Sequence, residues 1–594
     1  MSVQKGQKMV GWYDPGQLLR TAGEVVTSTI FGRHADQRLI EALFAGPEGL
    51  KDEDLFKDYS HDTELWLDYV ADVGDGWNAT YAVALHMSHS KLTLNYGARR
   101  YDTVRGRALI LGGDEVYPTA NRLEYQRRFF HPYDCAFDSA GTSRPDLFAI
   151  PGNHDWYDSL VSFTRYFIDK DDIAGFCTPQ LRSYFAIKLP HHWWLLATDT
   201  QLGSYIDGPQ LEYFGRVAAL IEPHDSVILC NAEPVWIYDH QYKTVDPNAD
   251  DRTLDFFERE VLKEKSIRVF LAGDLHHYRR HAAEDRTQKI TAGGGGAFLH
   301  PTHGSDVSYI QEGFAGDPQR PPRTFEHKKS WPSADVSRRL CWQNALFPIL
   351  NPKFGIAPAI LYLLTAWSVM APLGELGLSD IGAAMHITIL TALNNPLAIF
   401  WSVTVFLGFW LFTDTHVTWY RWTAGTIHGL THLLAVFFIG WGAAYVAIHD
   451  MGLQFRSIPQ LLLSGTIIFV GGYLVGAVLL GLYLLISLNG FGRHSNEAFS
   501  ALKVEDWKHF LRLKIGSDGT LTMFPIGIRR VPRRWAESPP GTSGPRYVPD
   551  DPKATKPELI EDPIVIMPLR SSSAPPATPK PVSPPIGVVL VHGE

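Results

Sequence analysis

The feature that most constrains this chain is a change of composition near residue 354. Residues 1–330 mix polar and apolar side chains as soluble proteins do, whereas the sequence from Phe354 to Leu488 is strongly apolar. A helix needs about 20 apolar residues to cross a hydrocarbon layer of about 30 Å. Four runs approach or exceed that length, and we place spans near 354–373, 395–413, 426–448 and 459–488, in a membrane domain over 354–490. The second span has an alternative start near Ile381, with Pro396 as a kink.

The rest of the chain divides by composition into further segments. Residues 1–50 form an N-terminal segment, 51–313 a soluble domain, and 314–353 a linker rich in Pro, Arg and Lys. Within 491–536, apolar and polar residues alternate around a Gly-Ser-Asp-Gly turn, which predicts a β-hairpin. A lone hairpin is not stable in water, so we expect it to dock on the soluble domain or the membrane face. The Pro, Ser and Thr content of 537–594 predicts a disordered tail.

Loop charges predict the orientation of the membrane domain. The loops before the first span, between the second and third, and after the fourth carry basic residues: Arg338, Arg339, Lys353, Arg421, Arg493 and Lys503. The other two loops together hold only Arg456. By the positive-inside rule, both soluble parts are expected in the cytoplasm, with the lipid bilayer as a partner. Gly472 and Gly476 form a GxxxG in the fourth span, a pattern that suits close helix packing and a homo-oligomer.

Charge and cysteine content exclude several classes of function. The formal net charge is −9 and no basic stripe is present, which argues against a nucleic-acid partner, because phosphate backbones are bound mainly by Lys and Arg. The four cysteines stand far apart without a CxxC pair, as expected for reduced thiols. The central parts of the spans lack Asp, Glu, Lys and Arg, which is typical of an anchor and not of an ion path.

Six apolar segments of the soluble domain each end in a polar turn. We predict strands at Trp66–Val73, Arg107–Leu111, Leu147–Ile150, Trp193–Ala197, Ser226–Cys230 and Val269–Ala272. Between them, Asn121–Phe130 and Thr253–Lys263 have the charge and spacing of surface helices. The polar residues follow the last apolar position of each strand, which is where α/β sheets place ligands. The pattern therefore predicts an α/β domain with a site at the carboxyl ends of its strands.

Three of these turns are rich in carboxylates. They read Gly113-Asp114, Gly152-Asn153-His154-Asp155 and Gly273-Asp274-Leu275-His276. A hydrolase that attacks phosphorus with water at neutral pH can use two metal ions about 3.5–4 Å apart, which acidify a bridging water and neutralise phosphoryl oxygens. Such a site needs one carboxylate between the metals and oxygen and nitrogen ligands around each. Together the turns predict a two-metal hydrolytic site.

This series of motifs, from Asp72 to His276, resembles that of calcineurin-like metallophosphoesterases. Their blocks run D-x-H or D-x-G, G-D-x-x, G-N-H-D/E, a lone histidine, and G-H-x-H. The resemblance covers roughly residues 65–305. It implies a four-layer α/β/β/α sandwich, two metal ions, and a phosphate ester substrate, either a monoester or a diester.

Carried over by position, the resemblance implies a role for each motif residue. Asp72 and His276 would bind the first metal, Asn153 the second, and Asp114 would bridge the pair. A hydroxide between the metals would attack in line.

The same carry-over gives His154 the task of protonating or stabilising the leaving alkoxide. Asp155 would orient the imidazole of His154 as its hydrogen-bond partner.

Three positions depart from the family pattern. Gly74 stands where the family has a histidine ligand, but Tyr117 stands in a GDxxY, where purple acid phosphatases supply a tyrosinate to ferric iron. Alternatively, Tyr117 packs beside Pro118 in the turn. Glu233 precedes a proline where the family has its lone histidine, and Asp274 replaces the first histidine of G-H-x-H.

These departures leave the second metal with oxygen ligands only. A hard ligand set of this kind favours Mn or Fe, with Zn as a further option. A degenerate site that binds one metal or none is the alternative interpretation.

Four further residues are candidates for binding the substrate. Asp75 and Asn78 lie on the same loop as Asp72, where they either contact substrate or cap the following helix. Gly294 belongs to a four-glycine run that leads toward His303. That run either lets backbone N–H groups approach a phosphate or is a tight crossover.

Two functional hypotheses follow. The first is a membrane-anchored, metal-dependent phosphoric ester hydrolase. The second is a membrane channel, transporter or scaffold whose phosphoesterase-like domain is not catalytic.

Overall fold

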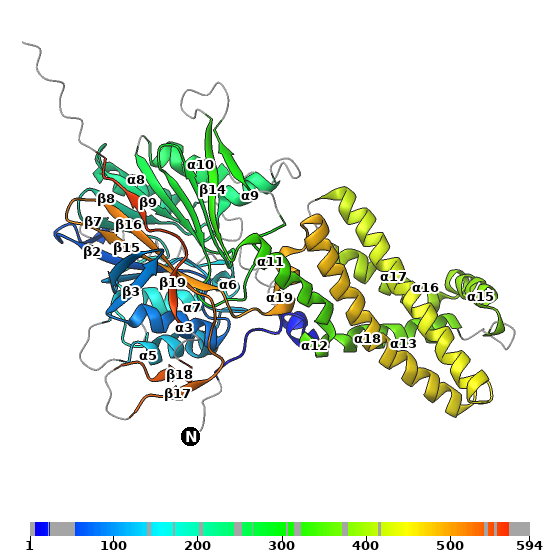
Figure 1. Ribbon diagram of the computed structural model, residues 1–594. Coiled ribbons are helices and arrows are strands. Elements are labelled where there is room, and N and C mark those ends of the chain that lie inside the picture. The colour runs from blue at the N-terminus through cyan, green and yellow to red at the C-terminus, as the bar shows by residue number, and fades with distance from the viewer. Residues whose placement is uncertain are drawn as a thin grey trace, which may run out of the picture.

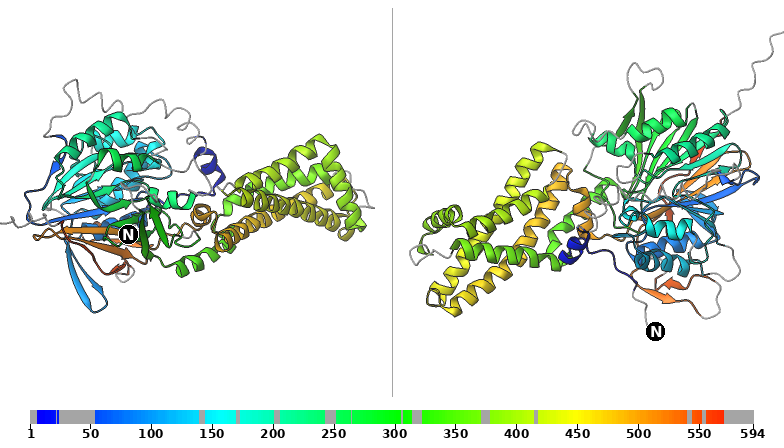
Figure 2. Two further views of the ribbon diagram at one scale, coloured as in Figure 1. Left: turned by 90° about the horizontal axis from the view of Figure 1, so that it is seen from above. Right: turned by 180° about the vertical axis from the view of Figure 1, so that it is seen from behind.

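The computed structural model describes residues 6–21, 23, 54–138, 144–169, 173–200, 206–242, 252–263, 265–304, 307–313, 322–370, 378–413, 417–539, 544–551 and 555–569. Figure 1 shows an α/β domain that contains two large sheets and, beside it, a bundle of long helices. Figure 2 shows from two further directions that the bundle projects from one end of the α/β domain. The expected mixed α/β domain and helical domain are both present.

The first sheet, sheet A, has nine strands among the described residues, in the order β1-β7-β8-β9-β10-β12-β11-β14-β13. Strands β8, β9, β10 and β12 run parallel to one another. The parallel strands are buried on both faces, as their near-continuous apolar sequences require. The bounds are β1 (Lys57–Asp58), β7 (Phe185–Leu189), β8 (Trp193–Ala197), β9 (Ser226–Cys230), β10 (Ser266–Ala272), β11 (Tyr278–Ala283), β12 (Gln288–Ala292), β13 (Tyr309–Glu312) and β14 (Arg323–Trp331).

The second sheet, sheet B, has seven strands in the described part of the chain, in the order β19-β16-β15-β2-β5-β6, with β20 also paired to β16. Strands β2, β5 and β6 are parallel, and β15 runs antiparallel to β2. The bounds are β2 (Leu65–Val70), β5 (Ala108–Leu111), β6 (Asp146–Ala149), β15 (Lys508–Ile515), β16 (Leu521–Ile528), β19 (Pro557–Leu559) and β20 (Ile564–Ile566).

The two sheets pack face to face, with helices on both outer faces. Side chains from both sheets, including Tyr69, Ile110, Ile228 and Leu271, share one buried cluster between them. A second cluster joins the outer face of sheet B to helices such as α3 and α5, and a third joins the outer face of sheet A to α8, α9 and η5. The covering helices are α3 (Trp77–Ser88), α4 (Arg122–Glu124), η3 (Tyr125–Phe130), α5 (His131–Ala136), α7 (Val161–Phe163), η4 (Thr164–Ile168), α8 (Gly208–Leu220), α9 (Val235–Tyr242), α10 (Arg252–Phe256) and η5 (Phe257–Val261).

Two pairs of strands lie outside the large sheets. Strands β3 (Lys91–Tyr96) and β4 (Arg99–Val104) form a hairpin. Strands β17 (Trp535–Glu537) and β18 (Tyr547–Pro549), which follow β16 in the chain, pair with each other.

The segment expected as a linker over 314–353 is structured where it is described. Strand β14 pairs with β11 and β13, so sheet A extends to Trp331. Its sequence is mostly polar, with Phe325 and Trp331 as the only apolar residues, and about half of it is exposed, so its composition is that of a linker. Short helices then lead to the bundle: α11 (Ala334–Cys341), η6 (Trp342–Leu346), α12 (Phe347–Leu350) and η7 (Pro352–Gly355).

Three helical stretches among the described residues are long and apolar enough to cross a membrane: Pro352–Met370, Thr418–Asp450 and Ile458–Phe491. A fourth candidate is the pair α15 (Ile381–Asn394) and α16 (Pro396–Phe412), which bends by 100° at its break. The bend is located where Pro396 has no backbone N–H to donate and Asn395 caps α16. The remaining bundle elements are α13 (Ile356–Met370), α17 (Thr418–Tyr445), η8 (Val446–Asp450) and α18 (Ile458–Phe491).

The GxxxG of the fourth span is used within the chain. A Cβ atom on Gly472 would lie 3.0 Å from Ala359 Cα, and one on Gly476 would lie 2.5 Å from Pro358 Cβ. Both glycines are buried in α18 against α13. The motif therefore lets these two helices approach closely, and it no longer indicates a homo-oligomer.

The C-terminal hairpin is part of sheet B. Strands β15 and β16 pair along their full length, and β15 also pairs with β2 from Ile515–Leu65 to Leu511–Tyr69. The expectation of a disordered tail from residue 537 is wrong for β17, β18, β19 and β20, because the last two of these extend sheet B beside β16. These strands have only three residues each, and of them only β20 lies in a short apolar segment, Ile564–Leu569. Residues 570–594 lie outside the described residues.

A buried ion pair fastens β15 to β2. Arg512 Nε donates to Asp68 Oδ1 at 2.7 Å and its Nη2 donates to Asp68 Oδ2 at 3.1 Å. The Arg512 side chain is fully buried and that of Asp68 nearly so. Nη2 also donates to the carbonyl of Met87, in α3, at 3.2 Å. One guanidinium thus ties together two strands and the helix that follows β2.

We predict that Arg512→Ala lowers the free energy of unfolding by about 3–5 kcal/mol, because it leaves the Asp68 carboxylate buried and unpaired. The matched control is Lys514→Ala on the same strand, whose ion pair with Glu64 at 2.9 Å is partly exposed. It should cost at most about 1 kcal/mol. Denaturant unfolding of the detergent-solubilised full chain, followed by tryptophan fluorescence, measures both. Equal effects would contradict this account of the fold.

Candidate metal centre

Three aspartates stand at the ends of parallel strands that meet at one edge of the sandwich. Asp72 follows β2, Asp114 follows β5, and both strands belong to sheet B. Asp274 follows β10 of sheet A. The backbone N–H of Asp274 donates to Asp72 Oδ2 at 2.9 Å, so the two sheet edges touch at the site. The structure therefore brings together residues that are 202 positions apart.

All three aspartates adopt left-handed backbone conformations. Their φ angles are 57° at Asp72, 55° at Asp114 and 62° at Asp274. Few residues other than glycine adopt this region, and such residues concentrate at functional sites, where the surrounding structure offsets a cost of about 1–3 kcal/mol each. Each strand thus turns sharply after its last apolar residue and directs a carboxylate to the same place.

Two glycines allow the loops to approach. Gly74 has a φ of +50°, and a Cβ there would lie 2.1 Å from Glu115 O. A Cβ on Gly152 would lie 2.1 Å from Asp114 Oδ1. The position where the family pattern has a histidine therefore has no room for a side chain, and the Asp114 carboxylate rests against the backbone of the GNHD turn.

Tyr117 places its hydroxyl among the expected ligands of the first metal. The oxygen lies 3.0 Å from Asp72 Oδ1, 3.0 Å from Asp114 Oδ2 and 3.0 Å from His276 Nε2. The ring is buried. The structure thus puts a phenol oxygen beside Asp72, Asp114 and His276.

His276 is held in one tautomer. Its Nδ1–H donates to the carbonyl of Phe298 at 2.7 Å, which leaves the Nε2 lone pair facing Tyr117 and Asp72. His300 stacks on the same ring, with 3.9 Å between the ring centres. Burial lowers the pKa of His276 well below its usual value, so the ring is neutral and suited to bind a metal.

The carboxylates repel one another in a buried place. Burial raises the pKa of Asp72 well above its usual value, and the charges of Asp114 and Asp274 raise it further. Burial likewise raises the pKa of Asp114, followed by the charges of Asp155 and Asp274. Ionised groups so arranged need a cation, and oxygen and imidazole donors are what Mn, Fe and Zn accept. The residues fit the expected metals.

The side of the second metal is more open. Asn153 Nδ2 donates to the Tyr157 hydroxyl at 3.1 Å, which leaves Asn153 Oδ1 3.0 Å from Asp114 Oδ2. Two oxygens at this separation need a cation between them, and without one the amide turns over so that its nitrogen donates to Asp114. Burial raises the pKa of Tyr157 to about 12, and the charges of Asp114, Asp274 and Glu233 add to the shift. Glu233 is therefore near this side of the site. It is half-buried, as are Asn153 and Asp274.

His154 stands beside Asp114 but is not held by Asp155. Its backbone N–H donates to Asp114 Oδ1 at 2.9 Å, and its Nδ1–H donates to the carbonyl of Pro118 at 2.5 Å. Burial lowers the pKa of His154 to about 4. The prediction that Asp155 orients this ring is wrong, because the Pro118 carbonyl does so.

Asp155 instead organises the backbone of the two sheet B turns. Its Oδ2 accepts from the N–H groups of Gly152 at 2.9 Å and Glu115 at 3.2 Å. Its Oδ1 accepts from the Tyr125 hydroxyl at 2.5 Å. The GNHD turn begins helix α6 (Asn153–Trp156). Because Glu115 follows Asp114 directly, Asp155 fixes the Asp114 turn and the GNHD turn relative to each other.

Asp75 and Asn78 do not face the metal centre. The Asp75 oxygens accept from the backbone N–H groups of Val10 at 2.8 Å and Phe298 at 3.2 Å. Asn78 donates to Glu505 at 3.2 Å and accepts from Trp535 at 3.0 Å. Helix α3 begins at Trp77, and its N-cap residue, Gly76, provides no side-chain cap. Both expected roles, substrate contact and capping, are therefore wrong, because each side chain binds a segment distant in sequence.

Gly294 and His303 also have structural partners. A Cβ on Gly294 would lie 2.0 Å from His509 Nδ1, so this glycine makes room for strand β15. His303 lies 2.7 Å from Ser337 Oγ through Nδ1 and 2.8 Å from Asn489 Oδ1 through Nε2. Gly294 serves a close approach of backbone to side chain without a positive φ, and His303 links the α/β domain to α11 and α18.

The N-terminal segment contributes residues that sequence reasoning missed. The Trp12 ring centre lies 5.8 Å from that of His154, 6.0 Å from Phe298 and 6.5 Å from Tyr117. Val10, Trp12, Tyr117 and Ala297 form one small apolar cluster. The only signal was the short apolar run Met9-Val10-Gly11-Trp12-Tyr13, which is too short to assign alone.

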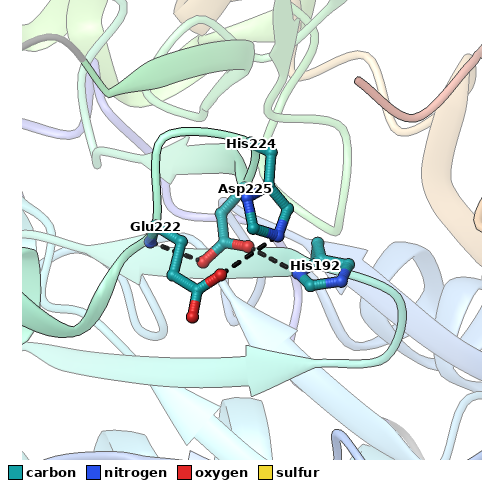
Figure 3. Close-up of side chains that lie close together, drawn as sticks. All are labelled: His192, Glu222, His224 and Asp225. Carbon is teal, nitrogen blue, oxygen red and sulfur yellow. Dashed lines mark hydrogen bonds and ion pairs between the residues drawn. The ribbon is translucent and has the colours of Figure 1, made fainter. Parts of the chain in front are cut away.

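A second group of metal-type side chains lies at the opposite ends of the strands (Figure 3). His192 precedes β8, and Glu222, His224 and Asp225 precede β9, with one ligand atom from each within 4.8 Å of the others. The spacing would allow a metal ion. The side chains already pair with one another, His192 with Asp225 at 2.9 Å and His224 with Glu222 at 3.1 Å. This group is separate from the predicted centre.

We predict that the full-length protein, purified after growth with Mn or Fe, holds about two metal ions per chain. Asp114→Ala should remove most of this metal, because Asp114 lies between the ligands of both positions. His192→Ala is the matched control and should leave the ions at the strand ends in place. Elemental analysis measures both. Full metal content in Asp114→Ala, or its complete loss in His192→Ala, would place the metal elsewhere.

A separate prediction concerns Tyr117. Tyr117→Phe keeps the buried ring but removes the oxygen that lies 3.0 Å from Asp72, Asp114 and His276. If the oxygen is a ligand, one of the two ions should bind at least about tenfold more weakly, a loss on the scale that a single ligand or its support contributes. Metal titration followed by calorimetry measures the change. An unchanged affinity would show that the ring only packs.

No protein-family model matches this chain. No curated protein matches it either. Among solved structures, it is similar to "GAP50 the anchor in the inner membrane complex of Plasmodium", with 12% identity, 44% of this chain and 78% of that chain covered, and a TM-score of 0.29. It is also similar to purple acid phosphatase PPD1 from yellow lupin (Lupinus luteus) seeds, with 11% identity, 46% and 50% covered, and a TM-score of 0.27. A third similar structure is PhoD, with 10% identity, 45% and 69% covered, and a TM-score of 0.25. Similarities of this size do not show a family.

Proposed function

We propose that this protein is a membrane-anchored, metal-dependent phosphoric ester hydrolase. The observation that carries the proposal is the convergence of Asp72, Asp114 and Asp274 on one buried place, each from a left-handed turn after a parallel strand. A fold gains no stability from two buried carboxylates with a half-buried third beside them unless a cation joins them. Tyr117 and His276 complete a ligand set of mixed oxygen and nitrogen at the same place.

The chain divides its donors between two positions. Asp72, Tyr117 and His276 would hold the first metal, Asn153, Glu233 and Asp274 the second, and Asp114 both. Two metal ions in such a site supply an activated water at neutral pH and neutralise the phosphoryl oxygens. The donors around the second position are all oxygens, which supports Mn or Fe, with Zn as the further option.

His154 is the residue that would assist the leaving group. Its Nδ1–H is engaged with Pro118, so Nε2 is the atom left to meet a substrate oxygen. The ring packs against Tyr117, with 4.3 Å between their centres, and against Trp12. These contacts fix the direction of the imidazole. Because Nδ1 carries the proton of the neutral ring and burial lowers the pKa to about 4, Nε2 would first take up a second proton, from the attacking water, and then give it to the departing alkoxide. Asp155 supports the turn on which His154 stands.

The helical bundle serves this enzyme as its anchor. Three helical stretches, or four if the bent pair is one span, have the length and composition to cross a bilayer among the residues described. The distribution of Lys and Arg in the loops supports a cytoplasmic location for the catalytic domain.

We predict that the full-length protein in detergent hydrolyses p-nitrophenyl phosphate or its bis-ester when loaded with Mn or Fe. Asp114→Asn should lower kcat by at least about 10²-fold, because it weakens the ligand between the two metals. His154→Ala should lower kcat by about 10²–10⁴-fold on alkyl phosphates, whose leaving groups need a proton. The same variant should lower kcat less on p-nitrophenyl esters, because their leaving group is a weak base.

The control for this prediction is His192→Ala, which lies at the opposite ends of the strands. Full activity in both Asp114→Asn and His154→Ala would refute the proposed site. A metal-loaded wild type with no activity on any ester would favour the scaffold interpretation instead. The full chain is required because β15 and β16 belong to the catalytic domain.

A further inference from the structure

The candidate metal centre is tied to the end of the helical bundle at which α18 ends. His276 binds the Phe298 carbonyl, and His300, stacked on His276, lies 3.2 Å from Asn496 through its Nε2. Asn496 belongs to α19 (Ser495–Leu502), which begins four residues after α18 ends at Phe491. One metal ligand is therefore two side chains away from the end of a candidate span.

The next residues of the same loop reinforce this link. His303 contacts Asn489 near the end of α18 and Ser337 in α11. A Cβ on Gly492 would lie 2.2 Å from Gly304 O, so the loop and the end of α18 are in backbone contact. Figure 1 shows α6, which carries His154, together with α11 and α19 at the end of the domain that faces the bundle. The catalytic edge of the sandwich thus faces the membrane helices.

Between the domain and the first span lies a surface with the chemistry of a lipid headgroup layer. We call residues 334–355, from α11 to η7, the interfacial elbow. Its exposed apolar side chains are Trp342 at 64%, Leu346 at 52% and Ile349 at 75%. Basic residues accompany them: Arg338 and Arg339 are exposed in the last turn of α11, and Lys353 is exposed in η7.

This combination of exposed apolar and basic side chains best fits one environment. Exposed Trp and aliphatic side chains beside Arg and Lys, immediately before an apolar span, suit the boundary between anionic headgroups and acyl chains. Water would leave the apolar side chains hydrated. The hydrocarbon interior would leave Arg338 and Arg339 without anionic partners, whereas Lys353 pairs with Asp14. The elbow therefore marks the height of the bilayer surface on the molecule.

We propose that the substrate is a phosphate ester carried by a membrane lipid, which meets the metal centre at the bilayer surface beside the interfacial elbow. This inference rests on the proposed function. The site lies on the membrane-facing end of the domain, and its loop is fixed to the ends of α18 and α19. A lipid headgroup is confined to the surface at which the elbow holds the site, whereas a soluble ester must reach it from bulk water. Confinement to one surface raises the effective concentration of the lipid ester.

The test compares lipid and soluble esters with the same phosphate chemistry. Full-length protein in mixed detergent micelles is assayed with two matched pairs of esters. The monoester pair is dioleoyl phosphatidic acid and glycerol 3-phosphate, and the diester pair is dioleoyl phosphatidylglycerol and glycerophosphoglycerol. At equal bulk concentration, the lipid of the favoured pair should be hydrolysed on the order of 10²-fold faster. Its rate should also fall when detergent dilutes the lipid within the micelles. The rate of p-nitrophenyl phosphate hydrolysis should not change with that dilution.

Variants of the elbow separate a surface effect from a loss of folding. Trp342→Ala with Leu346→Ala should lower lipid hydrolysis at least about tenfold and leave p-nitrophenyl phosphate hydrolysis unchanged, because apolar burial in the bilayer is lost. Leu220→Ala is the matched control, since Leu220 is 45% exposed on α8, remote from the bundle. It should change neither rate.

Two outcomes would overturn the inference while the proposed function stands. One is equal hydrolysis of lipid and soluble esters, and the other is an elbow variant that changes both rates alike. No hydrolysis of any ester by metal-loaded protein would refute the proposed function itself, and the inference with it.

Discussion

Strand β15 pairs with β2, and this pairing positions the residues of the candidate site. Strand β2 delivers Asp72, and five of its residues have register partners on β15. Strand β15 also supports the glycine run. The His509 N–H donates to the Gly294 carbonyl at 3.0 Å, and Lys508 binds the Ala297 carbonyl. The Arg512–Asp68 ion pair closes the contact from the outer face. The candidate metal centre thus depends on a strand that follows the helical bundle in sequence.

This arrangement makes the membrane helices an insertion within the α/β domain. The chain leaves sheet A at β14, passes through the bundle, and returns to sheet B at β15. Both connections are short and structured in the described residues, and the loop over Thr302 and His303 binds α11 and the end of α18. A domain joined to its anchor at three places has little freedom to rotate. The orientation of the site relative to the helical bundle is therefore part of the fold.

Local sequence predicted the elements whose signals are local. The bounds of β8 and β9 agree to the residue with the expected strands, because parallel strands buried on both faces appear as unbroken apolar runs. The turns after the strands were equally visible, and the structure brings Asp72, Asp114, Tyr117 and His276 together as their motifs implied. Strand β14 and the short strands β19 and β20 were not predicted. Their stability comes from a neighbouring strand and not from their own composition.

The same limit explains the errors within the site. Asp75, Asn78 and His303 lie near motif residues in sequence, but their partners are Val10, Glu505, Trp535 and Asn489. Nothing in a single sequence reveals such distant pairs. Asp155 is a different case, because its expected partner His154 is its neighbour in sequence. The positive-φ turn at Asp114 directs the Glu115 N–H toward Asp155, and the His154 ring binds the Pro118 carbonyl instead.

The most direct test of the central claim is an anomalous difference map from crystals of the Mn- or Fe-loaded full-length protein, recorded at the absorption edge of the metal. The account predicts two peaks about 3.5–4 Å apart between Asp72, Asp114, Asp274 and His276. No peak at the strand ends, or peaks only beside His192 and Glu222, would contradict it.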